Sequence, residues 1–452
     1  MATDGPIAPS STTWQADLHV PMLDLLITNA TLPDGRRHMS VAVQDGRIAE
    51  VTEGLRAPAH ETLDAGGLLL SPPFVDAHFH LDSALTYGQP RVNASGTLLE
   101  GIALWGELKP TLTHDAIAQR ALAYCDWAVA RGLLAIRSHV DTSDPRLLPV
   151  HALLDVKQRV APYLDLQLVA FPQDGLLRRA GALENLQRAL ALGVDVVGGI
   201  PHFERTYAEG SESVRILCAL AAEQGKRVDM HCDESDDPQS RHVETLACET
   251  QRLGLHGRVT GSHLTSMHSM DNDYASKLIA LMAEAQLGVV ANPLINVTLQ
   301  GRHDTYPKRR GMTRVPELLA AGLTVAFGHD CVLDPWYAGG SADMLEAAHM
   351  GLHLAQMTSA QAMRQCFEAV TTHPAALLGL QGYGLAPGCH ADFVLLHAQD
   401  PAEAIRLRAT RLGVWRRGRR VASSPAPVAQ LALPGRPDLV DLLAPPRSES
   451  LY

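Results

Sequence analysis

Pro73-Phe74-Val75-Asp76-Ala77-His78-Phe79-His80-Leu81-Asp82 is the stretch that decides the fold. It begins inside an apolar run, and an extended strand points residues i and i+2 to the same face. His78 and His80 are therefore expected to project together from the end of one strand, where two imidazoles can bind one metal ion. Ligand-type side chains also end three later strand-like runs, at His231, His263 and Asp330.

Apolar runs recur along the chain about every thirty residues, with helical stretches between them. These runs cover residues 68–75, 133–140, 166–171, 194–200, 228–230, 259–263, 288–294 and 323–327. One interval, residues 213–225, has an apolar stripe at helical spacing and ends at Gly225. Strands that are apolar throughout and alternate with helices predict a parallel sheet buried on both faces, and eight of them close a (β/α)8 barrel. An open doubly wound sheet is the alternative, but no Gly-x-Gly-x-x-Gly loop follows the first strand.

The two ends of the chain predict a small β domain. Short β runs occupy residues 25–28, 40–43 and 48–51 near the start, and 391–396, 412–415 and 420–422 near the end. Neither end has enough strands to bury a face alone. Residues 21–70 and 380–440 are therefore expected to form one β-sandwich domain, with the barrel over residues 71–379. Residues 1–20 are expected to be a flexible tail.

Composition limits the partners and the compartment. The net charge of -11 argues against a nucleic-acid or anionic-membrane partner. The seven cysteines are scattered and form no Cys-x-x-Cys pair, which favours a reducing compartment, the cytoplasm, and excludes the usual structural zinc spacings. The first twenty residues lack the pattern of a signal peptide, and no run approaches the ~20 apolar residues of a membrane span.

Polar residues are expected at the carboxyl ends of all the barrel strands, the rim at which such barrels carry their chemistry. In chain order they are His78 and His80, His139 and Asp141, Gln173, His202 and Glu204, His231 and Glu234, His263, Asn292, and His329 and Asp330. His139 and His202 are interpreted as histidines of the barrel mouth that only hydrogen-bond neighbouring loops, with a role in the site as the alternative for each. His329 is interpreted as structural, because strand alternation points it away from the mouth.

One mechanism uses the stronger candidates together. His78, His80, His231 and Asp330 would hold one divalent ion, Zn²⁺ or Fe²⁺, with room for a water. Such an ion lowers the pKa of bound water from about 15.7 toward about 7, which gives hydroxide at neutral pH. Asp330 is then placed to take the water's proton. A second carboxylate, Glu234, can pass a proton to a ring nitrogen of the substrate, and His263 can polarise the water.

The chain resembles the amidohydrolase superfamily, and within it is similar to bacterial cytosine deaminases of the barrel type. The matching segments are residues 72–75, 88–90, 95–98, 169–173, 200–204, 231–234, 300–302, 304–310 and 334–337. The last three are specific to this branch, whereas His-x-His marks only the superfamily.

The resemblance implies a role for each matching residue. The implied metal ligands are His78, His80, His231 and Asp330. The implied catalytic residues are Glu234, His263 and Asp330. The implied substrate-binding residues are Gln173, Leu98, Phe171, Cys331 and Trp336, with Gln173 reading the pyrimidine carbonyl and adjacent ring nitrogen.

The chain departs from the resembled enzymes directly after the metal-binding aspartate. They have a second aspartate there, and this chain has Cys331. We interpret Cys331 as a small apolar filler, which leaves room for a larger apolar substituent on the substrate ring.

The expected function is hydrolytic deamination of a small pyrimidine base in pyrimidine salvage. Cytosine would give uracil and ammonia, and 5-methylcytosine would give thymine and ammonia. Isocytosine, creatinine or an amino-triazine is the alternative substrate with the same metal site. A non-catalytic scaffold is a second alternative, against which the complete ligand set argues. The resemblance also suggests a homo-oligomer.

Overall fold

Eight parallel strands form one sheet in the computed structural model, which describes residue 1 and residues 22–443. Each strand pairs with the strand before it in the chain, so the order around the sheet is the chain order. The strands are β6 (Phe74–Phe79), β7 (Leu133–Asp141), β8 (Asp165–Phe171), β9 (Val196–Gly199), β10 (Arg227–Cys232), β11 (Val259–His263), β12 (Gly288–Ala291) and β13 (Val325–Phe327).

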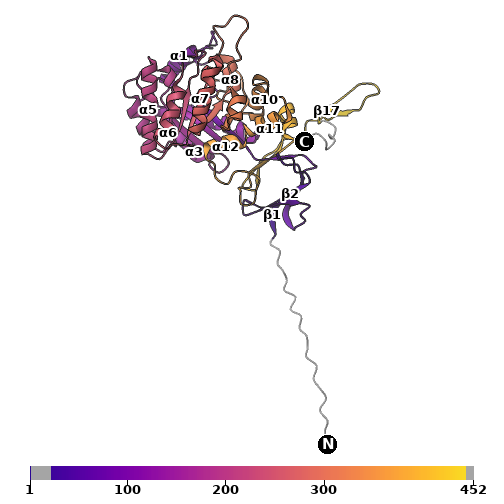
Figure 1. Ribbon diagram of the computed structural model, residues 1–452. Coiled ribbons are helices and arrows are strands. Elements are labelled where there is room, and N and C mark those ends of the chain that lie inside the picture. Colours follow the sequence, from indigo (N-terminus) through magenta and orange to yellow (C-terminus); the bar gives the residue numbers. More distant parts are fainter. Residues whose placement is uncertain (2–21, 444–452) are drawn as a thin grey trace.

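The first and last strands meet, which closes the sheet into a barrel. A parallel bridge joins Phe79 to Asp330, just beyond β13, and the Asp330 amide donates to the His78 carbonyl at 2.9 Å. Helices surround the strands (Figure 1). The predicted (β/α)8 barrel is therefore confirmed, and its seam lies at two of the residues expected to bind metal.

Helices follow the strands around the barrel. Those before the sixth strand are α1 (Leu98–Leu108), α2 (His114–Ala130), α3 (Leu148–Val160), α4 (Ala182–Ala191), α5 (Tyr207–Glu223) and α6 (His242–Arg252). Those after it are α7 (Asn272–Glu284), α8 (Pro293–Leu299), α9 (Val315–Ala320), α10 (Met344–Leu354), α11 (Ala360–Glu368), α12 (Thr372–Leu378) and α13 (Pro401–Leu407).

Three predicted segments were wrong in their bounds. The apolar run at 68–75 is split at Pro72 and Pro73 into β5 (Leu69–Ser71) and β6, which belong to different sheets. Helix α5 begins at Tyr207 and not at residue 213, because the Thr206 side chain caps it by accepting from the Glu209 amide. The apolar run at 288–294 is not one strand. Strand β12 ends at Ala291 and α8 starts at Pro293, where proline is favoured as the first helical residue.

The two ends of the chain form two four-stranded sheets that pack together. One sheet holds β1 (Leu23–Ala30), β2 (Met39–Gln44), β3 (Arg47–Glu53) and β4 (Ala59–Asp64). The other holds β5 (Leu69–Ser71), β14 (Phe393–Leu396), β15 (Arg411–Arg416) and β16 (Arg419–Ala422), so β5 from the first end pairs with β14 from the second. A shared apolar cluster that includes Leu25, Val41, Phe393 and Trp415 joins the sheets.

This packing confirms a β-sandwich built from both ends. The ranges 21–70 with 380–440, and 71–379, remain our proposal for the domain limits. The expected tail over residues 1–20 lies, except for residue 1, outside the described residues. Strand β4 and the short pair β17 (Ala429–Gln430) and β18 (Leu439–Val440) were not predicted.

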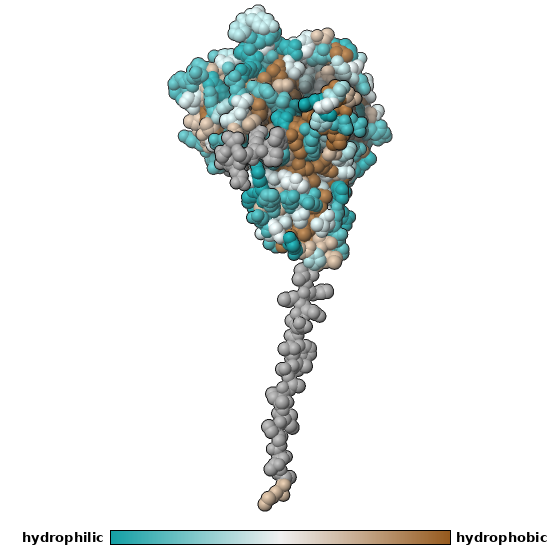
Figure 2. Space-filling model, turned by 90° about the vertical axis from the view of Figure 1, so that its right-hand side faces the viewer, coloured by the Kyte–Doolittle hydropathy of each residue, from teal (hydrophilic) through white to brown (hydrophobic). Residues whose placement is uncertain are grey.

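The surface is mixed in character. Hydrophobic residues gather in one region of the face shown in Figure 2, between hydrophilic margins. Among the described residues, no helix combines the length and the apolar character needed to cross a membrane.

Candidate active site

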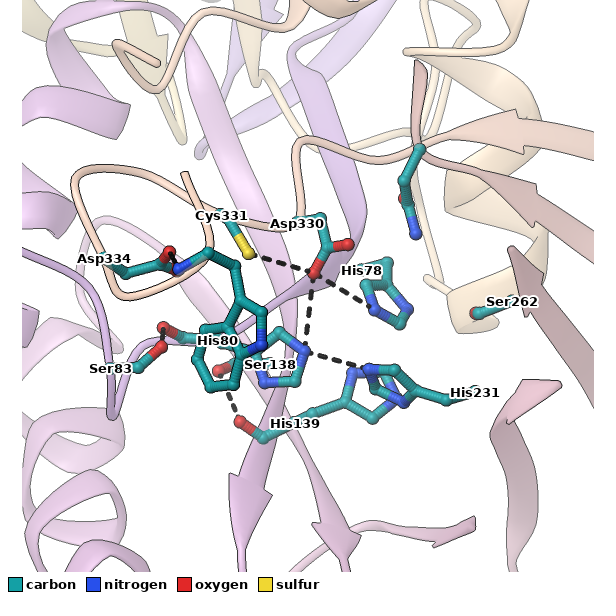
Figure 3. A network of polar contacts seen from close by, with 12 residues as sticks. His78, His80, Ser83, Ser138, His139, His231, Ser262, Asp330, Cys331 and Asp334 are labelled. Carbon is teal, nitrogen blue, oxygen red and sulfur yellow. Dashed lines mark hydrogen bonds and ion pairs between the residues drawn. The ribbon is translucent and has the colours of Figure 1, made fainter. Parts of the chain in front are cut away.

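The four residues expected to bind metal lie together at the carboxyl end of the barrel. His78 belongs to β6, His80 follows it, His231 belongs to β10, and Asp330 follows β13. His80 Nε2 lies 3.0 Å from His231 Nε2. Asp330 Oδ1 lies 3.5 Å from His78 Nε2 and 3.4 Å from His80 Nε2. Figure 3 shows these side chains pointing at one another from different strands.

Local contacts hold the barrel seam in this arrangement. Asp76 Oδ1 accepts from the His78 amide at 3.1 Å and from the His329 amide at 3.2 Å, so one buried carboxylate fixes both sides of the seam. Gly328 allows the close approach, because a Cβ there would lie 2.9 Å from the His78 Cβ and closer still to Asn292 Oδ1. His329 itself contacts the Cys331 carbonyl and lies 3.8 Å from Glu346, away from the cluster.

The donor set fits a divalent cation. Neither ring nitrogen of His78, nor Nδ1 of His231, has a hydrogen-bond partner among the described residues, although all these atoms are buried. Burial lowers the pKa of His78, His80, His231 and His263 well below the ordinary value for histidine. Neutral imidazoles beside a carboxylate are the ligands that Zn²⁺ and Fe²⁺ accept.

Metal-type donor atoms gather in two overlapping groups within the described part of the chain. One group is His78, His80, His139 and His231, and the other is His78, His231, His263 and Asp330. The His139 side chain thus lies inside the barrel beside the cluster, with its ring centroid 4.2 Å from that of His78. The interpretation of His139 as a histidine that hydrogen-bonds loops was wrong. His202 lies in the short turn after β9, and burial lowers its pKa to about 4.

Glu234 and His263 flank the cluster. Glu234 Oε1 lies 3.5 Å from His263 Nδ1, and His263 Nε2 lies 3.8 Å from Asp330 Oδ2. Burial, reinforced by the nearby Asp330 charge, raises the pKa of Glu234 well above its ordinary value. A carboxyl group with a raised pKa holds its proton to a higher pH than a free carboxyl group does, which suits it to deliver that proton to a substrate.

The loop after β10 positions Glu234. Asp233, with a φ of 52°, turns the chain there. Its carboxylate accepts from the Ser240 hydroxyl at 2.8 Å and from the amides of His242 and Val243 at 3.0 and 2.8 Å. These bonds tie the loop to the start of α6, so Glu234 is held by a preformed turn.

His80, His231 and Asp330 of the cluster line a cavity with about 350 Å³ of empty space between its lining atoms, and His78 lies outside this lining. Four of the five predicted substrate residues line it: Leu98, Gln173, Cys331 and Trp336. Phe171 does not line it; its ring stacks on the His231 imidazole with centroids 4.1 Å apart. A direct contact between Phe171 and the substrate stays a prediction.

Three apolar residues of the wall were missed in the sequence. Ile200, Ile295 and Leu299 complete the lining. Ile295 and Leu299 are one helical turn apart in α8, a spacing that could have indicated a shared face. It was hidden because the preceding apolar residues read as a continuing strand.

Cys331 is buried beside two acids. Its Sγ lies 3.6 Å from Asp330 Oδ1, and burial raises the pKa of the thiol well above its ordinary value. Burial also raises the pKa of Asp334 to about 7, although its Oδ1 accepts from the Trp336 and Tyr337 amides at 2.9 and 3.0 Å. The part of the cavity wall next to Asp330 is therefore formed by the uncharged thiol of Cys331.

A buried charged pair lies deeper in the barrel, and it too was missed. Arg137 is fully buried and donates to Asp229 Oδ2 at 2.8 Å and to the Leu377 carbonyl at 2.8 Å. Asp229 Oδ1 accepts from Ser262 at 2.7 Å and lies 3.7 Å from His139 Nε2. Burial alone would raise the pKa of Asp229, but His139 and the guanidinium hold it below its ordinary value.

Known proteins resemble the chain over most of its length. A model of the amidohydrolase family matches residues 61–422. The structure of 5-methylcytosine deaminase from Klebsiella pneumoniae, liganded with 5-fluorocytosine, is 41% identical with a TM-score of 0.88, covering 90% of this chain and 99% of that one. N-isopropylammelide isopropyl amidohydrolase of Pseudomonas sp. (strain ADP) is 27% identical over 413 residues, 90% of this chain and 99% of the relative. Pterin deaminase of Rhizobium rhizogenes is 27% identical over 412 residues, 87% and 93% of the two chains.

Proposed function

The chain belongs to the amidohydrolase family, and we propose that within it the protein hydrolytically deaminates an aminopyrimidine base, 5-methylcytosine or cytosine. The observation that carries this proposal is the small cavity that Glu234 and Gln173 line together with His80, His231 and Asp330 of the cluster. The similarity to a 5-methylcytosine deaminase supports the choice of substrate class. Membership of the amidohydrolase family and the similarity to a hydrolase argue against the alternative that the protein is a non-catalytic scaffold.

His78, His80, His231 and Asp330 are the residues proposed to hold one divalent ion, Zn²⁺ or Fe²⁺. When bound, such an ion supplies a Lewis acid that brings the pKa of a water near about 7. Three neutral imidazoles and one carboxylate are donors that either ion would accept.

The protein's own groups are proposed to move the protons. Asp330 accepts the proton of the attacking water at its carboxylate. Glu234 donates a proton to the ring nitrogen next to the carbon that bears the amino group, which makes that carbon more open to attack. The proton held by Asp330 then passes to the amino group, which leaves as ammonia. The water oxygen gives its second proton back to Glu234 and stays on the carbon as a carbonyl. His263 lies 3.5 Å from Glu234 and is placed to stabilise the charge that develops on the substrate and the attacking water.

Two pocket walls are proposed to select the base. Gln173 offers an amide N–H and a carbonyl, which match a ring carbonyl and an adjacent ring N–H. Cys331 puts a neutral thiol where a carboxylate would disfavour a methyl group, so 5-methylcytosine should be accepted at least as well as cytosine. Isocytosine, creatinine and an amino-triazine remain the alternative substrates, and the pterin deaminase and the isopropylammelide hydrolase show that relatives act on other heterocycles.

An ammonia-release screen tests the proposal. Purified protein, reconstituted separately with Zn²⁺ and Fe²⁺, is offered cytosine, 5-methylcytosine, isocytosine, creatinine, a pterin and an amino-triazine. The proposal expects turnover of one or both cytosines well above the other compounds. Turnover confined to the triazine, creatinine or pterin would overturn the substrate class while leaving the amidohydrolase assignment intact.

We propose in addition that the protein is a cytoplasmic homo-oligomer that serves pyrimidine salvage. The free state of all seven cysteines agrees with a reducing compartment. Light scattering in solution gives the oligomeric state, and the mass of a single chain would contradict the proposed homo-oligomer.

A further inference from the structure

Gly101 packs against the indole of Trp336 in a way that no other residue type would allow. Glycine weakens a helix interior relative to alanine, yet Gly101 lies buried within α1. A Cβ at this position would lie 2.8 Å from Trp336 Cγ and closer still to Cδ1 and Nε1. Gly106, on the same helix, is exposed and has nothing within 4 Å of its added Cβ. Helix geometry therefore does not require glycine at 101, whereas the indole does.

Hydrogen bonds hold the backbone around Trp336 against the start of α1. Asp334 Oδ1 accepts from the amide of Trp336 at 2.9 Å. The side chain of Asn93 donates both to the Thr97 carbonyl, at the N-cap of α1, and to the Pro335 carbonyl, each at 3.1 Å. The segment that carries the indole is thus tied to the helix that carries Gly101. A side chain at 101 must displace the ring itself.

The free side of the indole faces the substrate cavity. Trp336 lines that cavity together with Cys331, and its ring centroid lies 6.4 Å from that of His80. The cavity is small, with about 350 Å³ of empty space between its lining atoms. A shift of the indole by the width of one methyl group would therefore narrow it.

We infer that Gly101 is a specificity-determining residue: it lets the Trp336 indole lie back against α1 and so sets the width of the substrate cavity. This inference rests on the proposed deaminase function, because the cavity wall at Trp336 is taken to limit the substituent that a pyrimidine substrate can carry. Gly101 acts through Trp336 and touches no substrate.

Gly101→Ala tests the inference, with kcat and KM measured for cytosine and 5-methylcytosine on the metal-loaded enzyme. The ratio of kcat/KM for 5-methylcytosine to that for cytosine should fall at least about tenfold, the discrimination typical of one methyl group in an apolar pocket. Gly106→Ala is the matched control, since it makes the same change in helix propensity on the same helix, and its ratio should equal that of wild type. In Gly101→Ala combined with Trp336→Phe, the smaller ring should restore part of the lost preference.

A ratio in Gly101→Ala equal to that of Gly106→Ala would overturn the inference, and so would a double variant that recovers nothing. If wild type deaminates neither base, the proposed function fails separately. Crystal structures of wild type and Gly101→Ala then decide the geometric claim: an indole displaced into the cavity supports it, and an unmoved indole refutes it.

Discussion

Replacing Cys331 by aspartate should lower the preference of the enzyme for 5-methylcytosine over cytosine. The side chain is 4% exposed, and its Sγ lies 3.6 Å from Asp330 Oδ1. Asp334 lies on the other side, with a pKa that burial has already raised to about 7. A new carboxylate between two acids would either keep water with it, which would occupy the space meant for a substituent, or take up a proton and place a polar hydroxyl against the methyl group.

The expected change in kcat/KM follows from the free energy of placing one methyl group in that space. One methyl group in an apolar pocket is worth about 1–3 kcal/mol, or roughly 10–200-fold in kcat/KM. Cys331→Asp should therefore lower the ratio of kcat/KM for 5-methylcytosine to that for cytosine by at least about tenfold. Cys331→Ala, which keeps the room and adds no charge, should leave the ratio within a few-fold of wild type.

The assay is release of ammonia from both bases by the three proteins loaded with the same metal. An unchanged ratio in Cys331→Asp, or equal losses in the aspartate and alanine variants, would mean that residue 331 does not face the ring substituent. The argument from pocket charge would then fail, although the deaminase chemistry would stand.

Three other changes test the rest of the site. His80→Ala should lower the bound divalent metal, measured by mass spectrometry, to a small fraction of wild type, and normal metal content would remove His80 from the ligand set. Arg137→Met should lower the free energy of unfolding in urea by about 3–5 kcal/mol, because it leaves the buried Asp229 carboxylate without its cation; a loss below about 1 kcal/mol would contradict this. Asp334 has a folded-state pKa raised from 3.8 to about 7, so the stability it contributes is present below about pH 4 and lost as the pH rises to about 7. Asp334→Asn should remove this pH dependence, worth up to about 4 kcal/mol over that window, and parallel unfolding profiles for the two proteins would refute it.

The sequence predicted the barrel and the gathering of His78, His80, His231 and Asp330 at its carboxyl end, because both follow from local patterns. An apolar run that ends in His-x-His places two side chains on one face whatever the rest of the chain does. The same holds for Asp330, which comes three residues after the end of the apolar run 323–327. Where a local pattern was ambiguous, the prediction failed: residues 288–294 are apolar throughout, and only Pro293 marks the change from strand to helix.

Contacts between distant segments could not be predicted in this way. Arg137 and Asp229 each lie within a run that reads as buried strand, and their pairing across 92 residues appears only in the folded barrel. In the sequence, Gly101 reads only as a residue that weakens a helix. Its contact with Trp336, far along the chain, appears only in the structure. His139 was misinterpreted for the same reason, because alternation within β7 does not say which other strands face it.

The most direct test of the central claim is ammonia release from 5-methylcytosine by wild type and by Glu234→Gln, each with its metal content measured. Wild type should release ammonia and form thymine in equal amounts. Glu234→Gln should keep its metal and lose at least about 100-fold in kcat, the usual scale of general acid–base catalysis. Full activity in Glu234→Gln, or no release from either cytosine by metal-loaded wild type, would contradict the account.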